Sequence, residues 1–221
     1  MTDPILDAGR QIVLLDCGAH DLSTLPELLK DIPILPTIIE IYEPNPEFEL
    51  EKNLESIRKY IHESTHVDLF SDAIWTYDGT VKFSQEFQSN RHNTPPDIQP
   101  QFAIDKPATS EASAITSTLP SNLEDDVCHR FSFADPIDVN CVDLSRIIKK
   151  HKDDYEVVIK MDIEGAEYDV LRHLIREGTA QYINTLFIEW HFSSMSNETE
   201  ESSDRIIEKL TEAGVSVREW Y

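Results

Sequence analysis

Four charged side chains fall within eight residues in the segment Lys160-Met161-Asp162-Ile163-Glu164-Gly165-Ala166-Glu167. The segment follows an apolar run, and Asp162 stands where that run ends. Burying such charges is costly unless they pair, bind a metal or take part in chemistry. Glu164 and Glu167 also lie near the expected start of a helix, where negative charge is favoured by roughly 0.3–1 kcal/mol, so helix capping explains these two equally well. The segment is a candidate reactive site, with Lys160 and Asp162 as candidate catalytic residues.

A second candidate group is Glu189-Trp190-His191, at the end of another apolar run. Alternation along a strand would place Glu189 and His191 on the same face. Together with Asp162 they could form a divalent-metal site or an acid/base cluster. Oxygen donors with one imidazole suit Mg²⁺ or Mn²⁺ better than Zn²⁺, which favours sulfur and nitrogen. A core histidine that is hydrogen-bonded to a glutamate is the alternative.

Two further segments have the pattern of a nucleoside site. Asp16-Cys17-Gly18-Ala19-His20 follows the first apolar run, and a glycine there lets a ligand approach the backbone while the following helix offers free N–H groups. Glu43 ends the second apolar run, some 25 residues past the glycine, where a carboxylate could accept from both hydroxyls of a ribose. Each alone is typical of an ordinary turn or a solvated strand end. The pair Gly18 and Glu43 indicates a ligand that contains adenosine, whereas the absence of G-x-G-x-x-G disfavours NAD and FAD.

The elements that must position these residues alternate between strands and helices. This alternation predicts an α/β fold with a mainly parallel sheet covered on both faces. Ligands bind beyond the carboxyl ends of the strands in such sheets. We expect strands at 12–16, 37–42, 67–75, 81–83, 156–162, 184–191 and 215–221, helices near 22–31 and at 46–62, 166–177 and 203–213, and a strand, a cap at Asp143 and a helix within 137–150. The polar residues at the strand ends should then converge on one edge: Asp16, Glu43, Asp72, Asp162, Glu189 and His191.

Residues 84–130 differ in composition from the rest of the chain. Ser, Thr, Pro, Asn and Gln dominate there, and apolar periodicity is lost. Such a long stretch without secondary structure is unusual inside a compact domain. We therefore interpret residues 1–221 as a single domain with a mobile insertion at about 84–130, which is either a substrate lid or a surface loop without a role.

The net charge of −23, from 42 acidic and 19 basic residues, repels phosphate backbones and anionic lipid. Without a basic patch, nucleic acid is excluded as a partner. No apolar run approaches the ~20 residues of a membrane-spanning helix, and the first residues do not resemble a signal peptide. Cys17, Cys128 and Cys141 form no disulfide or zinc pattern. We expect a cytoplasmic protein, and its oligomeric state is left open.

The order of these motifs resembles the FkbM-like methyltransferases. VVIKMDIEGAEYDVLRHLI is similar to the hallmark segment of that family, a D-x-E-G-x-E stretch after a strand. LLDCGAH resembles its cofactor loop, and IYEPNPEFELEKNL resembles its second-strand segment with E-P-x-P. AIWTYDGTVKF, VNCVDLSRII and TLFIEWH follow in the expected order, so the resemblance covers most of 12–192 outside the insertion.

The resemblance implies the class I methyltransferase fold, a Rossmann-like sheet of seven strands, the last antiparallel, with helices on both faces. It implies S-adenosyl-L-methionine as the cofactor and a hydroxyl of a sugar, glycan or related small molecule as the acceptor. A non-catalytic module that retains this fold and binds an adenosine cofactor is the alternative function. A sugar-nucleotide enzyme of the Rossmann class would require the missing glycine fingerprint.

With that cofactor, we expect Glu43 to bind the ribose, and Asp72 or the backbone near Ala73 to contact the adenine. The family often has a second glycine near the position of Leu22, so we expect the loop here to be tighter or differently shaped. The full set of expected cofactor contacts is Asp16, Gly18, Ala19, His20, Glu43, Asp72, Ala73 and Asp162.

Methyl transfer to a hydroxyl also needs a base, or a metal that lowers the pKa of the hydroxyl. We expect His191 or Asp162 to be the base. Asp162, Glu189 and His191 would hold Mg²⁺ or Mn²⁺ if a metal takes part, because two close carboxylates repel unless a cation or a shared proton lies between them.

Overall fold

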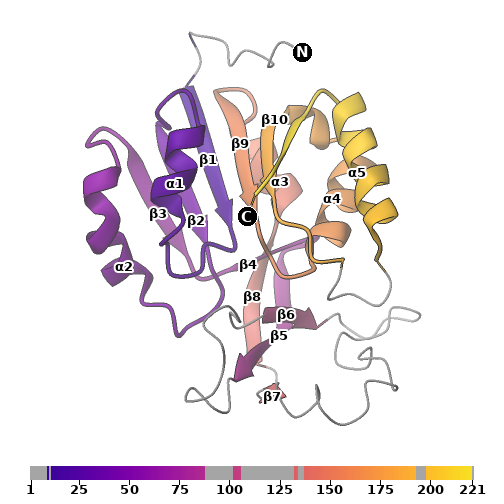
Figure 1. Ribbon diagram of the computed structural model, residues 1–221, viewed down its shortest axis with the longest axis horizontal. Helices are drawn as coiled ribbons and strands as arrows, with labels where there is room; N and C mark the ends of the chain where they lie inside the picture. The colour runs from indigo at the N-terminus through magenta and orange to yellow at the C-terminus, as the bar shows by residue number, and fades with distance from the viewer. Residues whose placement is uncertain are drawn as a thin grey trace.

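The computed structural model of the chain describes residues 9, 11–87, 102–105, 132–133, 137–192 and 198–220. Within these residues, six strands form the main sheet in the order β11-β10-β9-β1-β2-β3, and every neighbouring pair is parallel (Figure 1). The predicted α/β class is therefore confirmed. The strands are β1 (Gln11–Cys17), β2 (Ile38–Tyr42), β3 (His66–Phe70), β9 (Tyr155–Met161), β10 (Ile183–Ile188) and β11 (Ser216–Glu219).

Helices cover both faces of this sheet, as predicted. One face packs against α1 (Leu25–Asp31) and α2 (Leu50–Ile57), which a 3₁₀ turn at Arg58–Tyr60 extends. The other packs against α3 (Leu144–His151), α4 (Glu167–Arg176) and α5 (Glu200–Glu212). A short 3₁₀ turn, Ala180–Tyr182, leads into β10. None of the helices in the described part of the chain combines the length and the apolar character needed to cross a membrane.

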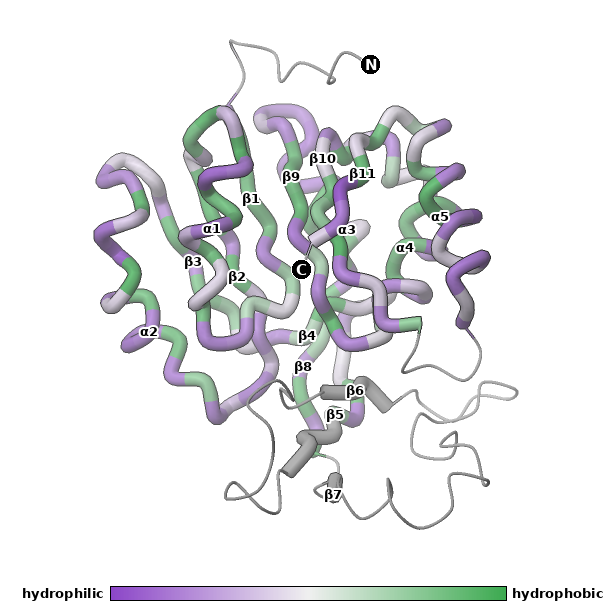
Figure 2. Tube along the Cα trace, in the orientation of Figure 1, coloured by the Kyte–Doolittle hydropathy of each residue, from purple (hydrophilic) through white to green (hydrophobic). Residues whose placement is uncertain are grey.

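The central strand β1 shows why this sheet needs two helical layers. Val13 and Leu15 face the α3–α5 side, and Ile12 and Leu14 face the α1–α2 side, all fully buried. A strand that is buried on both faces reads as a continuous apolar run rather than an alternating one. In Figure 2, much of the middle strands β1 and β9 has the green colour of hydrophobic residues.

A second sheet lies beyond the carboxyl ends of the main strands, in the lower part of Figure 1. Its order is β4-β8-β5-β6, and β7 pairs with β5. β4 runs parallel to β8, whereas β5 is antiparallel to β8, β6 and β7. This sheet therefore flanks the edge at which the site was predicted. Its strands are β4 (Ala73–Trp75), β5 (Gly79–Phe87), β6 (Phe102–Asp105), β7 (Ser132–Phe133) and β8 (Ile137–Asp143).

Two strand predictions need correction. The single strand expected at 67–75 is two strands, because the chain leaves β3 after Phe70 and joins the second sheet as β4. The main sheet has six strands instead of seven in the described residues, and β11 is parallel to β10 instead of antiparallel. Helix α5 connects the two strands as a crossover, and such a connection returns the chain in the same direction.

The predicted insertion at 84–130 falls mostly outside the described residues. Strand β5 runs on to Phe87, and β6 lies at Phe102–Asp105, so parts of this range pair within the second sheet. The mobility of the insertion and the single-domain interpretation stay predictions.

Candidate active site

A pocket opens beyond the carboxyl ends of β1, β2 and β9. Five of the residues predicted to contact the cofactor line it, whereas Asp16 and Ala19 are buried beside it and Asp72 precedes its wall at β4. The structure thus brings together segments that are more than one hundred residues apart in sequence, which is the convergence that the topology predicted. The five lining residues are Gly18, His20, Glu43, Ala73 and Asp162.

Gly18 is required by a neighbouring backbone. Its φ is +76°, a left-handed conformation that favours glycine, and a Cβ at this position would lie 1.8 Å from the carbonyl oxygen of Asp162. The main-chain N–H of Asp162 also donates to the carbonyl of Cys17 (3.0 Å). The close contact at Gly18 is therefore made within the protein, between the loop that follows β1 (residues 18–24, the β1 loop) and the turn after β9. The approach of a ligand to Gly18 stays a prediction.

Glu43 is buried, and both of its carboxylate oxygens are oriented by the backbone. Oε2 accepts from the main-chain N–H of His20 and Oε1 from that of Asn45, each at 2.8 Å. Burial raises the pKa of Glu43 to about 7, against the effect of these two hydrogen bonds. A carboxylate oxygen has more than one lone pair, so both oxygens can accept further hydrogen bonds from a ligand in the pocket.

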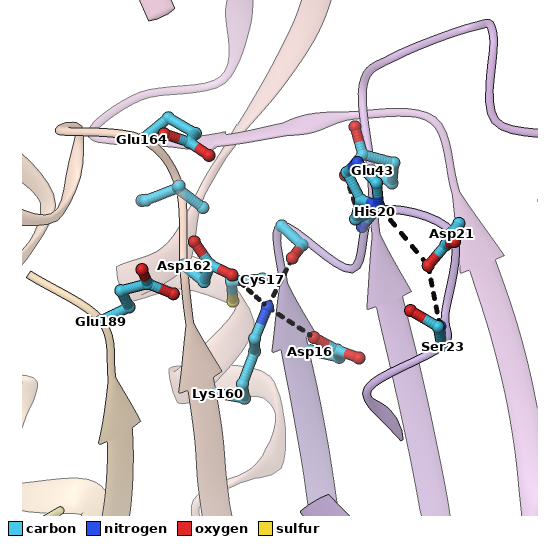
Figure 3. Close-up of polar contacts among 12 residues, drawn as sticks. Asp16, Cys17, His20, Asp21, Ser23, Glu43, Lys160, Asp162, Glu164 and Glu189 are labelled. Atoms are coloured by element: carbon cyan, nitrogen blue, oxygen red, sulfur yellow. Dashed lines mark hydrogen bonds and ion pairs between the residues drawn. The ribbon is translucent and has the colours of Figure 1, made fainter. Parts of the chain in front are cut away.

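Lys160 links the β1 loop to the turn after β9, as Figure 3 shows. Its buried Nζ donates to the carbonyl of Gly18 (2.6 Å) and to Oδ2 of Asp162 (3.2 Å), and lies 3.7 Å from Oδ1 of Asp16. Burial lowers the pKa of Lys160, but the two aspartates raise it more, and the net shift is upward. These contacts position the loop, and the catalytic role expected for Lys160 stays a prediction.

The turn after β9 has an unusual backbone. Glu164 has φ +56° and Gly165 has φ +99°, and α4 begins at Glu167. A left-handed glutamate is strained, and such strain is typical of functional sites. The turn places Glu164 at the pocket wall, with its carboxylate 3.4 Å from Nε2 of His191.

His191 is surrounded by carboxylates. Its Nδ1 lies 2.9 Å from Oε1 of Glu167, and its Nε2 lies 3.8 Å from both Oδ1 of Asp162 and Oε1 of Glu189. Burial lowers the pKa of His191, but the hydrogen bond to Glu167 and the nearby carboxylates raise it to about 9. A protonated imidazole carries one positive charge, whereas four carboxylates lie within 3.8 Å of it.

The predicted strand geometry at this site was wrong in one respect. Strand β10 ends at Ile188, so Glu189, Trp190 and His191 follow the strand and alternation does not set their directions. His191 turns inward and is buried, whereas the side chain of Glu189 is 41% exposed. Both still lie near Asp162, because β9 and β10 are adjacent in the sheet.

Among the described residues, three side chains offer donor atoms that all lie within 4.8 Å of one another: Asp162, Glu164 and His191. Their donor set, two carboxylates and one imidazole, fits Mg²⁺ or Mn²⁺. Glu164 thus takes the place in this trio that we had assigned to Glu189. The metal role of Glu189 stays a prediction, since its carboxylate remains close to the same imidazole nitrogen.

A family model described as the methyltransferase FkbM domain matches residues 16–217. This chain belongs to the FkbM methyltransferase family. Comparisons with curated proteins and with solved structures found no significant match. The family match includes the β1 loop, Glu43, the turn after β9 and the residues after β10, which are the four parts of the site.

The β1 loop of this FkbM methyltransferase has a left-handed residue where a second glycine was expected. Leu22 has φ +65° and its side chain is fully buried in the α1–α2 layer. Leu22 thus adopts a left-handed conformation at a position where the family often has glycine. The leucine therefore does not prevent the chain from adopting a left-handed turn here, and the expected change of loop shape stays a prediction.

Sequence reasoning assigned no site role to Glu164 or to Glu167 in this FkbM methyltransferase. Glu167 was interpreted equally well as a helix cap, and it accepts from the main-chain N–H of Ile163 (2.9 Å), in the turn that leads into α4. The same oxygen also meets His191, which the cap interpretation did not include. The adjacency of β9 and β10, the strands that precede these two residues, was the signal that could have paired them.

Proposed function

We propose that this chain transfers a methyl group from S-adenosyl-L-methionine to a hydroxyl of a sugar, a glycan or a related small molecule. The observation that carries the proposal is the position of Asp162, which belongs both to the pocket wall and to the cluster around His191. A group at this junction can face the cofactor and the acceptor at the same time. The alternative, cofactor binding without catalysis, gives no reason to gather so many charges beside the pocket.

The pocket supports the following placement of the cofactor, which supplies an activated methyl group. Glu43 accepts hydrogen bonds from the ribose hydroxyls, because its oxygens are held at the end of β2. Gly18 and His20 lie along the loop that would follow the ribose and the amino-acid part. Asp72 or the backbone near Ala73 would contact the adenine, which the position of Ala73 at the pocket wall supports.

The cluster supports acid/base chemistry at a hydroxyl. Asp162 or the neutral form of His191 accepts the proton that the acceptor loses, since an alcohol is a weak nucleophile at neutral pH. Because the pKa of His191 is about 9, its neutral form requires a higher pH or the loss of a proton to a bound metal. Asp162, Glu164 and His191 are the residues that would hold Mg²⁺ or Mn²⁺. Such a cation, when bound, lowers the pKa of a hydroxyl that it contacts.

The cytoplasm is the compartment that we propose. Cys17 and Cys141 are both buried free thiols in the described part of the chain, as is typical of a reducing environment. The net charge of −23 supports an uncharged acceptor, such as a neutral sugar, over nucleic acid.

The proposal is tested by methyl transfer from labelled S-adenosyl-L-methionine to a panel of sugars and glycans, with EDTA and with added Mg²⁺ or Mn²⁺. We expect transfer to at least one hydroxyl, loss of activity in EDTA, and recovery with the metal. Asp162→Asn should lose turnover while cofactor affinity stays within a few-fold. Glu198→Gln, at an ion pair with Arg172 on α4, is the control and should keep full activity.

The outcomes separate the parts of the proposal. Full activity in EDTA would remove the metal and retain the base. Full activity of both Asp162→Asn and His191→Gln would remove the whole cluster from the reaction. Cofactor binding without transfer to any acceptor in the panel would favour the non-catalytic module.

A further inference from the structure

We infer that Glu167 is a positioning residue, which holds the ring of His191 so that Nδ1 donates to Glu167 and Nε2 faces Asp162 and Glu164. The inference rests on the proposed function, because it concerns the same cluster. Glu167 does not itself line the pocket, and of the three proposed metal ligands it is hydrogen-bonded to His191.

The direction of the hydrogen bond follows from the second contact of the same oxygen. Oε1 of Glu167 accepts from the main-chain N–H of Ile163 (2.9 Å), so this oxygen is an acceptor. Nδ1 of His191 lies 2.9 Å from it and must therefore be the donor. When a metal at Nε2 displaces the second proton of the imidazolium, the remaining proton therefore stays on Nδ1.

The distances on the other side of the ring suit an ion better than direct hydrogen bonds. Nε2 lies 3.4 Å from Oε2 of Glu164 and 3.8 Å from Oδ1 of Asp162, which is longer than an ordinary hydrogen bond. Ligands on opposite sides of Mg²⁺ are about 4.2 Å apart, given bond lengths of about 2.1 Å. The space on the Nε2 side therefore fits the coordination of a small divalent cation.

Glu167 also ties together the two segments that supply the cluster. Asp162 and Glu164 come from the turn after β9, and His191 comes from the chain after β10. Through one oxygen, Glu167 contacts Ile163 in the first segment and His191 in the second. An outer carboxylate that orients a ligating histidine is a common feature of metal sites, and its loss typically weakens metal affinity by about 10–100-fold.

Helix capping alone leaves one property of Glu167 unexplained. The side chain is 0% exposed, and its Oε2 has no hydrogen-bond partner among the described residues. A buried carboxylate with one unmatched oxygen is costly, whereas an exposed cap would satisfy Ile163 without that penalty. The buried position is explained if the carboxylate is needed beside the imidazole.

The test compares Glu167→Leu with Glu167→Gln, in the full chain. Glutamine keeps an oxygen that can accept from both Ile163 and His191, whereas leucine keeps the approximate volume and removes the acceptor. Asp169→Asn is the matched control, since Asp169 also stands in the first turn of α4. Thermal unfolding of each variant verifies that it folds.

Two measurements are made. In protein labelled with ¹⁵N-histidine, we expect an Nδ1–H proton of His191 that is protected from solvent exchange in the wild type and in Glu167→Gln, and lost in Glu167→Leu. In calorimetric titrations with Mn²⁺, we expect Glu167→Leu to bind at least about tenfold more weakly. Glu167→Gln and Asp169→Asn should stay much closer to the wild type, and cofactor affinity should change little in all three.

A proton on Nε2 with none on Nδ1 of His191 in the wild type would overturn the inference, as would equal Mn²⁺ affinity of folded Glu167→Leu and wild type. Absence of Mn²⁺ binding by the wild type would overturn it together with the proposed metal. If both measurements give the expected result and no hydroxyl is methylated, the proposed function fails and the positioning role of Glu167 stands.

Discussion

The carbonyl oxygen of Asp162 occupies the space that a side chain on Gly18 would need. A Cβ there would lie 1.8 Å from this oxygen, and the φ of +76° is already unfavourable for other residues. Lys160 adds a hydrogen bond from its Nζ to the carbonyl of Gly18. The β1 loop and the turn after β9 are therefore held in one arrangement, and neither can shift without the other.

Gly18→Ala should destabilise the fold by at least about 3 kcal/mol, because backbone strain and a severe steric overlap add together. Gly214→Ala is the control. Its φ is +93° and a Cβ there has nothing within 4 Å, so we expect only the strain of about 1–2 kcal/mol. Urea unfolding of both variants measures the difference. Equal losses for the two variants would show that the contact with Asp162 contributes nothing.

Glu43→Ala should weaken the binding of S-adenosyl-L-methionine at least tenfold at pH 8. Two hydrogen bonds to a charged group would be lost, at about 1.5–3 kcal/mol each. Calorimetry of the variant and the wild type gives the ratio. An unchanged affinity would remove Glu43 from the ribose site.

The pKa of Glu43 also predicts a pH dependence of stability. The pKa is about 7 in the folded protein and 4.5 for a free side chain, so the folded state binds the proton more tightly. Its contribution to stability is present below pH 4.5 and is lost as the pH rises through 7, by about 3 kcal/mol in total. Glu43→Gln lacks this loss, so the wild type should become less stable relative to the variant between pH 5 and pH 8. Parallel stability curves for the two proteins would contradict this.

Lys160→Met should destabilise the protein by about 3–5 kcal/mol, because it leaves buried aspartates without their cation. Adding Asp16→Asn to this variant removes one of the unpaired charges and should restore part of the stability. A double-mutant cycle in urea measures the coupling between the two positions. Lys160 Nζ lies 3.7 Å from Oδ1 of Asp16, which suggests that the two are coupled. If Lys160→Met were as stable as the wild type, this coupling would be absent.

Glu164→Gln and Glu189→Gln distinguish the two possible metal trios. Loss of an outer partner alone lowers metal affinity by about 10–100-fold, so loss of a ligand should cost at least about tenfold. Because Glu164 and not Glu189 belongs to the compact trio, we expect that loss of Mn²⁺ affinity only for Glu164→Gln. The reverse pattern would restore the trio predicted from the sequence.

Features that depend on neighbouring residues were predictable from the sequence. The Asp143 cap of α3 is an example, since its side chain accepts from the N–H of Ser145 two residues later. The buried strand before Asp162 and the acid at the end of β2 were also predicted, because apolar runs and strand ends are local patterns. These predictions were enough to bring Gly18, Glu43 and Asp162 to one edge.

Features that depend on distant partners were not predictable in the same way. The apolar pattern continues from β3 into β4, and only the pairing of β4 with β8 reveals that the chain changes sheets. The direction of His191 depends on how the chain leaves β10, and its contact with Glu167 joins residues 24 apart in sequence. The choice of Glu164 over Glu189 depends on a left-handed backbone at Glu164, which glutamate itself does not favour.

The shape of the β1 loop depends on the burial of Leu22 rather than on a second glycine. A loop shaped by glycines owes its path to local backbone freedom, and its sequence can be moved to another scaffold. Here the left-handed turn is maintained by a leucine side chain that is embedded beneath α1, beside Leu25 and Leu28. With the cofactor placed as proposed, substitutions in that layer would alter cofactor affinity without touching the pocket, and a change in this loop would require a matching change in the helix below it.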